Sequence, residues 1–174
     1  MVKCKLNICY LFKGESGSNS QKVELWWKYL LNVINCKMYL QNNGGYLTIQ
    51  VDQDAELDNI TCTSFELFMI KERSIPIFEL DTKNDNIIAI AWEPRGHQFA
   101  VIHGDRPNHD ISIYSMCTSD NISHVSRLTT LRNGHASAVF WSPARKFIVI
   151  VGKKDTKGQF ECYNVDDLEI MATE

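Results

Sequence analysis

The chain has 174 residues, of which 44% are hydrophobic and 22% charged, enough for one globular domain that buries about two-thirds of its unfolded surface. Eighteen basic residues against 21 acidic ones give a net charge of −3. This balance argues against a protein whose main task is to neutralise nucleic-acid phosphates. We therefore expect any contact with RNA to be local.

Residues 1–34 are predicted to form an N-terminal extension. Its apolar run, residues 6–12, has the length of a signal-peptide core, but Asn7 interrupts it and no small-residue cleavage site follows. Residues 14–21 are polar and contain glycine and serine, which is typical of a flexible linker. Residues 23–31 fit a short helix, although their paired tryptophans would also suit an exposed sheet edge. The expectation is an irregular or short helical segment.

A sequence repeat follows this extension. Trp92 and Trp141 head two similar phrases 49 positions apart, and Leu40 takes the tryptophan place in an earlier unit. Each of these residues is followed, six or seven positions later, by a second aromatic residue of the repeat. The predicted repeat anchors are Leu40 and Tyr46, Trp92 and Phe99, and Trp141 and Phe147. A period of this size is typical of propeller blades.

Each unit contains two apolar segments joined by a polar turn, a third alternating segment and a mixed outer segment, which is the four-strand plan of a blade. The chain is therefore predicted to be all-β, a partial β-propeller over residues 35–174. Its three antiparallel blades are expected at about residues 36–80, 87–131 and 136–173. The turn at residues 143–145 lacks the glycine of the other two turns, so we expect it to be slightly strained or differently shaped.

The tryptophans allow two interpretations. Aromatic side chains near basic residues can stack on nucleic-acid bases. However, Trp92 and Trp141 occupy equivalent repeat positions with apolar neighbours, which favours packing between blades.

Several phrases carry a family resemblance. Residues 90–94 (IAWEP), 140–143 (FWSP) and 163–166 (YNVD) resemble the b subunit of eukaryotic translation initiation factor three, plant members in particular. The resemblance extends over about residues 31–174. It implies a WD-type propeller that is preceded by an RNA-recognition domain and followed by a helical tail. It also implies a non-catalytic, cytoplasmic scaffold that contacts other subunits of the factor and the small ribosomal subunit, including its RNA.

The chain departs from the family pattern at particular positions. Leu40 stands where tryptophan is usual, and Arg145 stands where a turn glycine is usual. Residues 1–30 do not resemble the family, and the RNA-recognition domain is absent from this sequence. The alternative hypothesis is therefore a truncated, non-functional product. Three blades cannot close a ring, so we expect exposed apolar faces and a tendency to aggregate.

The sequence offers little that supports catalysis or metal binding. No two of the six cysteines have the C-x-x-C spacing of a zinc or redox site, which predicts free thiols in a reducing compartment. His103 and His109, with Asp105 and Asp110, lack the spacing of a metal site. There is no G-x-S-x-G elbow and no phosphate loop. We expect no catalytic residue, metal, cofactor, small-molecule substrate or membrane contact, and a propeller-type enzyme is disfavoured.

One basic surface is predicted from the blade plan. The loops after the second and fourth strands of each blade open on one side of a propeller, and there they would gather a basic rim of Arg106, Lys153, Lys154 and Lys157. His109 would belong to the same rim, and Arg132 and His135 would lie between its residues. Such a rim suits ribosomal RNA or an acidic partner. The alternative is a set of solvated loops, since lysine is common on exposed surfaces.

Overall fold

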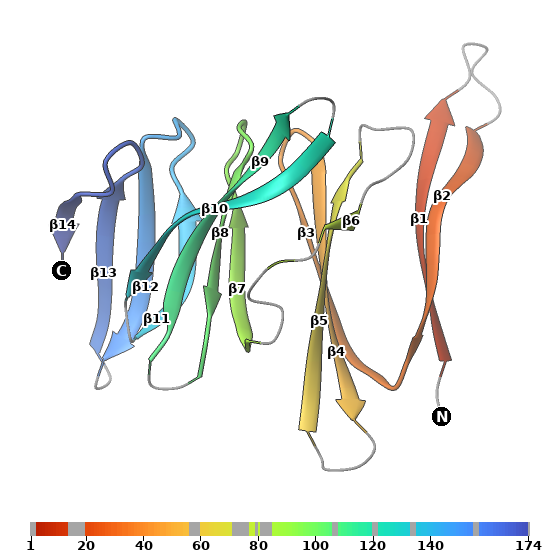
Figure 1. The fold of residues 1–174 in the computed structure, drawn as a ribbon, viewed down its shortest axis with the longest axis horizontal. Coiled ribbons are helices and arrows are strands. Elements are labelled where there is room, and N and C mark those ends of the chain that lie inside the picture. The colour runs from red at the N-terminus through yellow and green to blue at the C-terminus, as the bar shows by residue number, and fades with distance from the viewer. Residues whose placement is uncertain are drawn as a thin grey trace.

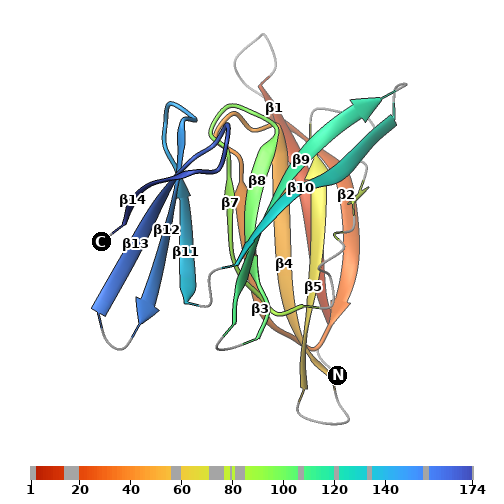
Figure 2. The same cartoon turned by 60° about the vertical axis from the view of Figure 1, so that its left-hand side comes forward.

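The computed structural model describes residues 3–13, 20–55, 60–70, 77–78, 80, 85–105, 108–119, 122–132, 135–154 and 157–173. All regular structure in these ranges is β, in one two-stranded and three four-stranded antiparallel sheets. The sheets stand side by side in chain order, with the N-terminal hairpin at one end and β14 at the other (Figures 1 and 2). This arrangement confirms the predicted partial β-propeller.

Each four-stranded sheet is one blade whose strands follow one another in sequence. Blade one consists of β3 (Val33–Leu40), β4 (Tyr46–Ala55), β5 (Ile60–Met69) and β6 (Ile77–Phe78). Blade two consists of β7 (Ile87–Trp92), β8 (Gln98–His103), β9 (Asp110–Ser119) and β10 (Ile122–Arg132). Blade three consists of β11 (Ala136–Trp141), β12 (Phe147–Lys154), β13 (Lys157–Asn164) and β14 (Ile170–Thr173).

The N-terminal segment differs from the prediction of a flexible or short helical extension. It forms a β-hairpin of β1 (Lys3–Lys13) and β2 (Ser20–Leu31), so the helix expected at residues 23–31 is wrong. Pairing along the whole of β1 overrides a weak helical pattern, and the aromatic and branched side chains of β2 favour a strand. Most of the predicted linker, residues 14–19, lies outside the described residues. Leu30 of β2 packs on the apolar face of blade one.

Strand register corrects part of the predicted repeat. Trp92 pairs with Phe99, and the equivalent pair in blade three is Trp141 with Ile148. The partner of Leu40 is likewise Leu47 rather than Tyr46. The prediction aligned the blades by similar residue types, so its second anchor lies one position too early in blades one and three. A shift of one residue in a strand moves a side chain to the opposite face of the sheet.

The cores lie between the blades rather than within them. Blades one and two share a cluster in which the rings of Tyr46 and Trp92 stack with centroids 5.1 Å apart. The ring of Phe99 is tilted against that of Trp92, with centroids 4.7 Å apart. Blades two and three share a second cluster that contains Ile102, Ile113, Ile148 and Ile150. Each sheet is therefore apolar on both faces, as in stacked propeller blades.

The outer face of blade three has the same apolar character without a blade against it. Phe140 is 57% exposed and Phe147 is 36% exposed, whereas Ala91, the counterpart of Phe140 in blade two, packs toward blade three. At the other end, Leu40 in β3 is 60% exposed. Leu40 and Phe147 are therefore not buried anchors, because each lies on a face that no neighbouring blade covers.

Candidate interaction surfaces and a buried Ser-His-Asp chain

The described part of the predicted basic rim is a lysine hairpin, made of Lys153, Lys154 and Lys157. Lys153 and Lys154 end β12, Lys157 begins β13, and the backbones of Lys154 and Lys157 pair with each other. These three backbone positions therefore lie together at one end of blade three. The fourth predicted residue, Arg106, lies outside the described residues. The end of β8 and the start of β9 lie at the same end of the molecule as the hairpin (Figures 1 and 2).

The other basic residues expected at this end divide into two groups. Arg132 and His135 are exposed near the start of blade three. His109 is buried, and its Nδ1 lies 2.7 Å from the carbonyl oxygen of Ala136. The expectation that His109 belongs to the rim was wrong, because its ring joins blade two to the first strand of blade three.

A chain of polar side chains crosses blade two, and sequence reasoning missed it. His103 Nδ1 lies 2.8 Å from Asp85 Oδ2, and His103 Nε2 lies 2.8 Å from Ser112 Oγ. This connectivity is that of a Ser-His-Asp catalytic triad. Its members come from three neighbouring segments of one blade, so no short sequence motif marks it.

The burial and partners of Ser112 indicate a structural role for these three hydrogen-bonded side chains. Ser112 is 0% exposed, and its hydroxyl also lies 2.9 Å from Thr130 Oγ1. A nucleophile must meet its substrate, whereas this hydroxyl is enclosed by the blade. These hydrogen bonds link the segment before β7 to β8, β9 and the outer strand β10. They thereby satisfy polar groups that would otherwise be costly to bury.

The tryptophans make a repeated bond between blades. Trp92 Nε1 donates to the Tyr39 carbonyl oxygen at 3.1 Å and lies equally close to Thr48 Oγ1. Trp141 Nε1 donates to the Ala91 carbonyl oxygen at 3.0 Å. Tyr39 and Ala91 precede equivalent positions of the repeat. Each indole is thus fixed to the inner strand of the preceding blade, which is a packing role rather than a base-stacking one.

A second link between blades uses the residues that follow Leu40 and Trp92, which are Gln41 and Glu93. Gln41 Nε2 donates to the Gly96 carbonyl oxygen at 2.6 Å. Glu93 is 1% exposed, accepts a hydrogen bond from the Gln98 backbone N–H at 3.2 Å, and forms an ion pair with Arg145 of blade three. Buried charges of this kind need such partners.

The turns that support these links are conformationally demanding. Arg145 has a φ of +64°, so the turn without glycine is strained as predicted. Gly96 is required for a different reason. A Cβ atom there would lie 1.6 Å from Glu93 Oε2, so the buried carboxylate occupies the space of a side chain.

Two tyrosines have raised pKa values. Burial, with the nearby charge of Asp52, raises the pKa of Tyr39. Burial and a 2.7 Å hydrogen bond to Glu161 raise the pKa of Tyr163. Both phenols are neutral at physiological pH and serve packing and hydrogen bonding.

Metal binding finds no geometric support in the described ranges. They contain no group of three or more His, Cys, Asp and Glu side chains that could hold an ion. The described part of the chain also has no helix with the length and hydropathy of a membrane span.

The repeated blade contacts agree with the comparison to known families. The family model described as "Eukaryotic translation initiation factor eIF2A" matches residues 28–174. The chain belongs to this family. Its relatives include the B subunit of eukaryotic translation initiation factor 3 from Arabidopsis thaliana, 51% identical over 95% of this chain, and that from Xenopus laevis, 34% identical over 85%. These matches cover 25% and 21% of the relatives, so the chain spans about a quarter of their length. The resemblance inferred from the sequence phrases is thereby confirmed.

Solved structures support the fold independently of close sequence similarity. A crystal structure of a eukaryotic initiation factor superposes with a TM-score of 0.66 at 13% identity, covering 96% of this chain and 40% of that one. Sqt1 from Chaetomium thermophilum gives a TM-score of 0.60 at 15% identity, covering 98% of this chain and 43% of that one. The β-propeller domain of the Trilobed protease from Pyrococcus furiosus gives 0.52 at 13% identity, covering 80% and 42%.

Proposed function

We propose that this chain is a non-catalytic interaction module of translation initiation, which binds other subunits of initiation factor 3 and the small ribosomal subunit in the cytoplasm. The observation that carries the proposal is the 51% identity to the B subunit of initiation factor 3 over 95% of the chain. A scaffold role agrees with blades whose polar side chains are engaged in holding the fold. The enclosed Ser112 hydroxyl argues for the same conclusion.

The lysine hairpin is the surface we assign to RNA. Backbone pairing brings three lysine positions to one end of blade three, on a chain whose overall charge is −3. We therefore assign the attraction to a polyanion to this end. Phosphate contacts fix position without reading sequence, and each one releases condensed counterions. Binding should weaken steeply as salt rises.

Co-sedimentation of the tagged full chain with small ribosomal subunits, at low and moderate salt, tests this proposal. The rim variant carries Lys153→Glu, Lys154→Glu and Lys157→Glu, and Arg106→Glu is added in a second variant. The matched control reverses three exposed basic residues elsewhere, Lys37, Arg95 and Lys146.

We expect the parent and the control to sediment with the ribosomal particles at low salt and the rim variants to remain in the supernatant. Equal sedimentation of the control and rim variants would remove the lysine hairpin from consideration. A folded parent that fails to sediment at low salt would instead favour the non-functional, truncated alternative. Circular dichroism of each variant establishes that it is folded.

A further inference from the structure

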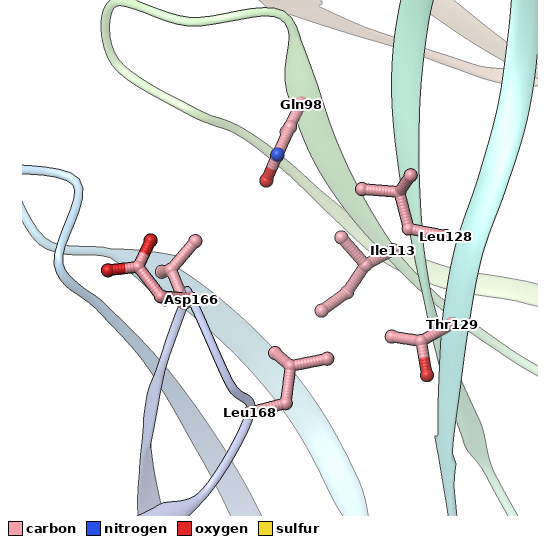
Figure 3. A pocket seen from close by; sticks show the side chains of 7 residues that line it. Gln98, Ile113, Leu128, Thr129, Asp166 and Leu168 are labelled. Atoms are coloured by element: carbon pink, nitrogen blue, oxygen red, sulfur yellow. The ribbon is translucent and has the colours of Figure 1, made fainter.

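A hollow of about 290 Å³ lies between blades two and three (Figure 3). It is lined by Gln98, Ile113, Leu128, Thr129, Val165, Asp166 and Leu168. Its volume is at the lower end of the range for small-molecule sites, which suits one or two side chains better than a cofactor. The turn at residues 165–168 and the lysine hairpin lie at opposite ends of β13, so this surface is separate from the one assigned to RNA.

Leu128 is directed to the hollow by a β-bulge. The pairing of β10 with β9 shifts between Arg127 and Thr129, which leaves Leu128 as the extra residue. Its side chain is 52% exposed. A bulge re-aims a side chain and leaves it outside the regular ladder. The packing of blade two does not use this leucine, since it belongs to none of the core clusters of the described residues.

Leu168 forms the opposite wall and has an unusual backbone. Its φ is +59°, in the left-handed region that glycine and asparagine occupy more readily. Its N–H donates to the Asn164 carbonyl oxygen at 2.9 Å, which fixes the turn. A leucine in this conformation sends an aliphatic side chain toward Ile113 in the floor of the hollow (Figure 3).

The mouth of the hollow carries an unpaired negative charge. Asp166 is exposed, and its carboxylate accepts no hydrogen bond and forms no ion pair with any residue that the structure describes. The neighbouring Asp167, by contrast, accepts from the side-chain amide of Asn164 and the backbone N–H of Glu169. Asp166 is therefore available to a cation from outside. The same carboxylate would repel the phosphates of a nucleic acid.

We propose that this hollow binds an extended peptide segment of a partner protein that carries an aliphatic residue and, two positions later, arginine or lysine, because alternate side chains of an extended chain face the same way. The aliphatic side chain would lie between Leu128 and Leu168, and the basic side chain would pair with Asp166. The amide of Gln98 and the hydroxyl of Thr129 would bond to the peptide main chain. Burial of the aliphatic group supplies affinity, and charge complementarity with Asp166 selects the basic residue. This inference stands without the proposed contact to ribosomal RNA.

Three labelled peptides of the form Gly-Ser-X-Gly-Z-Gly-Ser test the proposal by fluorescence anisotropy on the full chain. X and Z are Leu and Arg, Leu and Glu, or Gly and Arg, and the peptides are named Leu-Arg, Leu-Glu and Gly-Arg after these two positions. We expect the Leu-Arg peptide to bind at least fivefold more tightly than the other two. Leu128→Ser should reduce that affinity at least fivefold, and because Leu128 is half exposed the variant should keep the parent's melting temperature.

Charge reversal makes the test specific. Asp166→Arg should bring the preference over to the Leu-Glu peptide, whereas Asp105→Arg, a control at an exposed residue of the β8–β9 connection, should leave the order of affinities unchanged. Equal affinities for all three peptides, or no binding of Leu-Arg to a folded parent, would overturn the proposal. If Leu128→Ser instead abolishes self-association in sedimentation velocity, a second copy of the chain occupies the hollow and the proposal is wrong.

Discussion

Replacement of Arg145 by glycine sets two effects of this structure against each other. The φ of +64° at Arg145 costs about 1–2 kcal/mol for a residue with a Cβ atom, and glycine removes most of that cost. The same change takes away the guanidinium that pairs with the buried carboxylate of Glu93. Breaking a buried ion pair costs about 3–5 kcal/mol.

The balance can be worked out from the exposure of the two side chains. Glu93 is 1% exposed, but 49% of the Arg145 side chain is in contact with solvent. Water can therefore partly replace the lost partner, and we take about 2–3 kcal/mol for the pair. After about 1 kcal/mol of strain relief, Arg145→Gly should lower the free energy of unfolding by about 1–2 kcal/mol.

A second background separates the two effects. In Glu93→Gln the buried charge is absent, so Arg145→Gly should there raise stability by up to about 1 kcal/mol. Urea unfolding of the four full-length chains, followed by far-UV circular dichroism, measures both differences. The reasoning would be refuted if Arg145→Gly stabilised the parent, or if it changed stability by the same amount in both backgrounds.

Further predictions use the same assays. Gly96→Ala should lower the free energy of unfolding by at least about 2 kcal/mol, because the new Cβ would displace the buried Glu93 carboxylate. In the control Gly158→Ala the new Cβ meets nothing within 4 Å, so the loss should be less than about 0.5 kcal/mol. Equal losses would contradict the steric argument. Trp92→Ala should cost about 3–5 kcal/mol, more than Trp141→Ala, since Trp92 is only 9% exposed and Trp141 is partly buried. The folded chain should resist labelling by a fluorophosphonate probe, because Ser112 is enclosed; labelling that Ser112→Ala abolishes would restore the catalytic interpretation.

The sequence predicted the blades because their cause is local. Apolar alternation, turn residues and the spacing of Trp92 and Trp141 all follow from the period of the repeat. The strand register was harder to predict. Phe147 resembles Phe99 in residue type, but Ile148 is the residue that pairs with Trp141 as Phe99 pairs with Trp92. The N-terminal hairpin was missed because a short segment of mixed pattern takes its structure from its partner strand.

The functional surfaces were less accessible to sequence reasoning. The three lysines of the hairpin are near neighbours in the chain, so the blade plan brought them together. The Asp85–His103–Ser112 hydrogen-bond relay depends on the register of neighbouring strands, and the Leu128–Leu168 hollow depends on two blades packing together. The hollow is marked by a bulge at Leu128 and a left-handed backbone at Leu168, and residue identity does not reveal either.

The direction of the tryptophan bonds has a consequence for how the chain is made. Each indole reaches back to a carbonyl about 50 positions earlier, Trp92 to Tyr39 and Trp141 to Ala91. During synthesis a blade therefore leaves the ribosome well before the residue that fastens it to its neighbour. At 5–20 residues per second the delay is roughly 3–10 s. In that interval the apolar face of each new blade stays uncovered, so the blades are bonded to one another in the order in which they are translated.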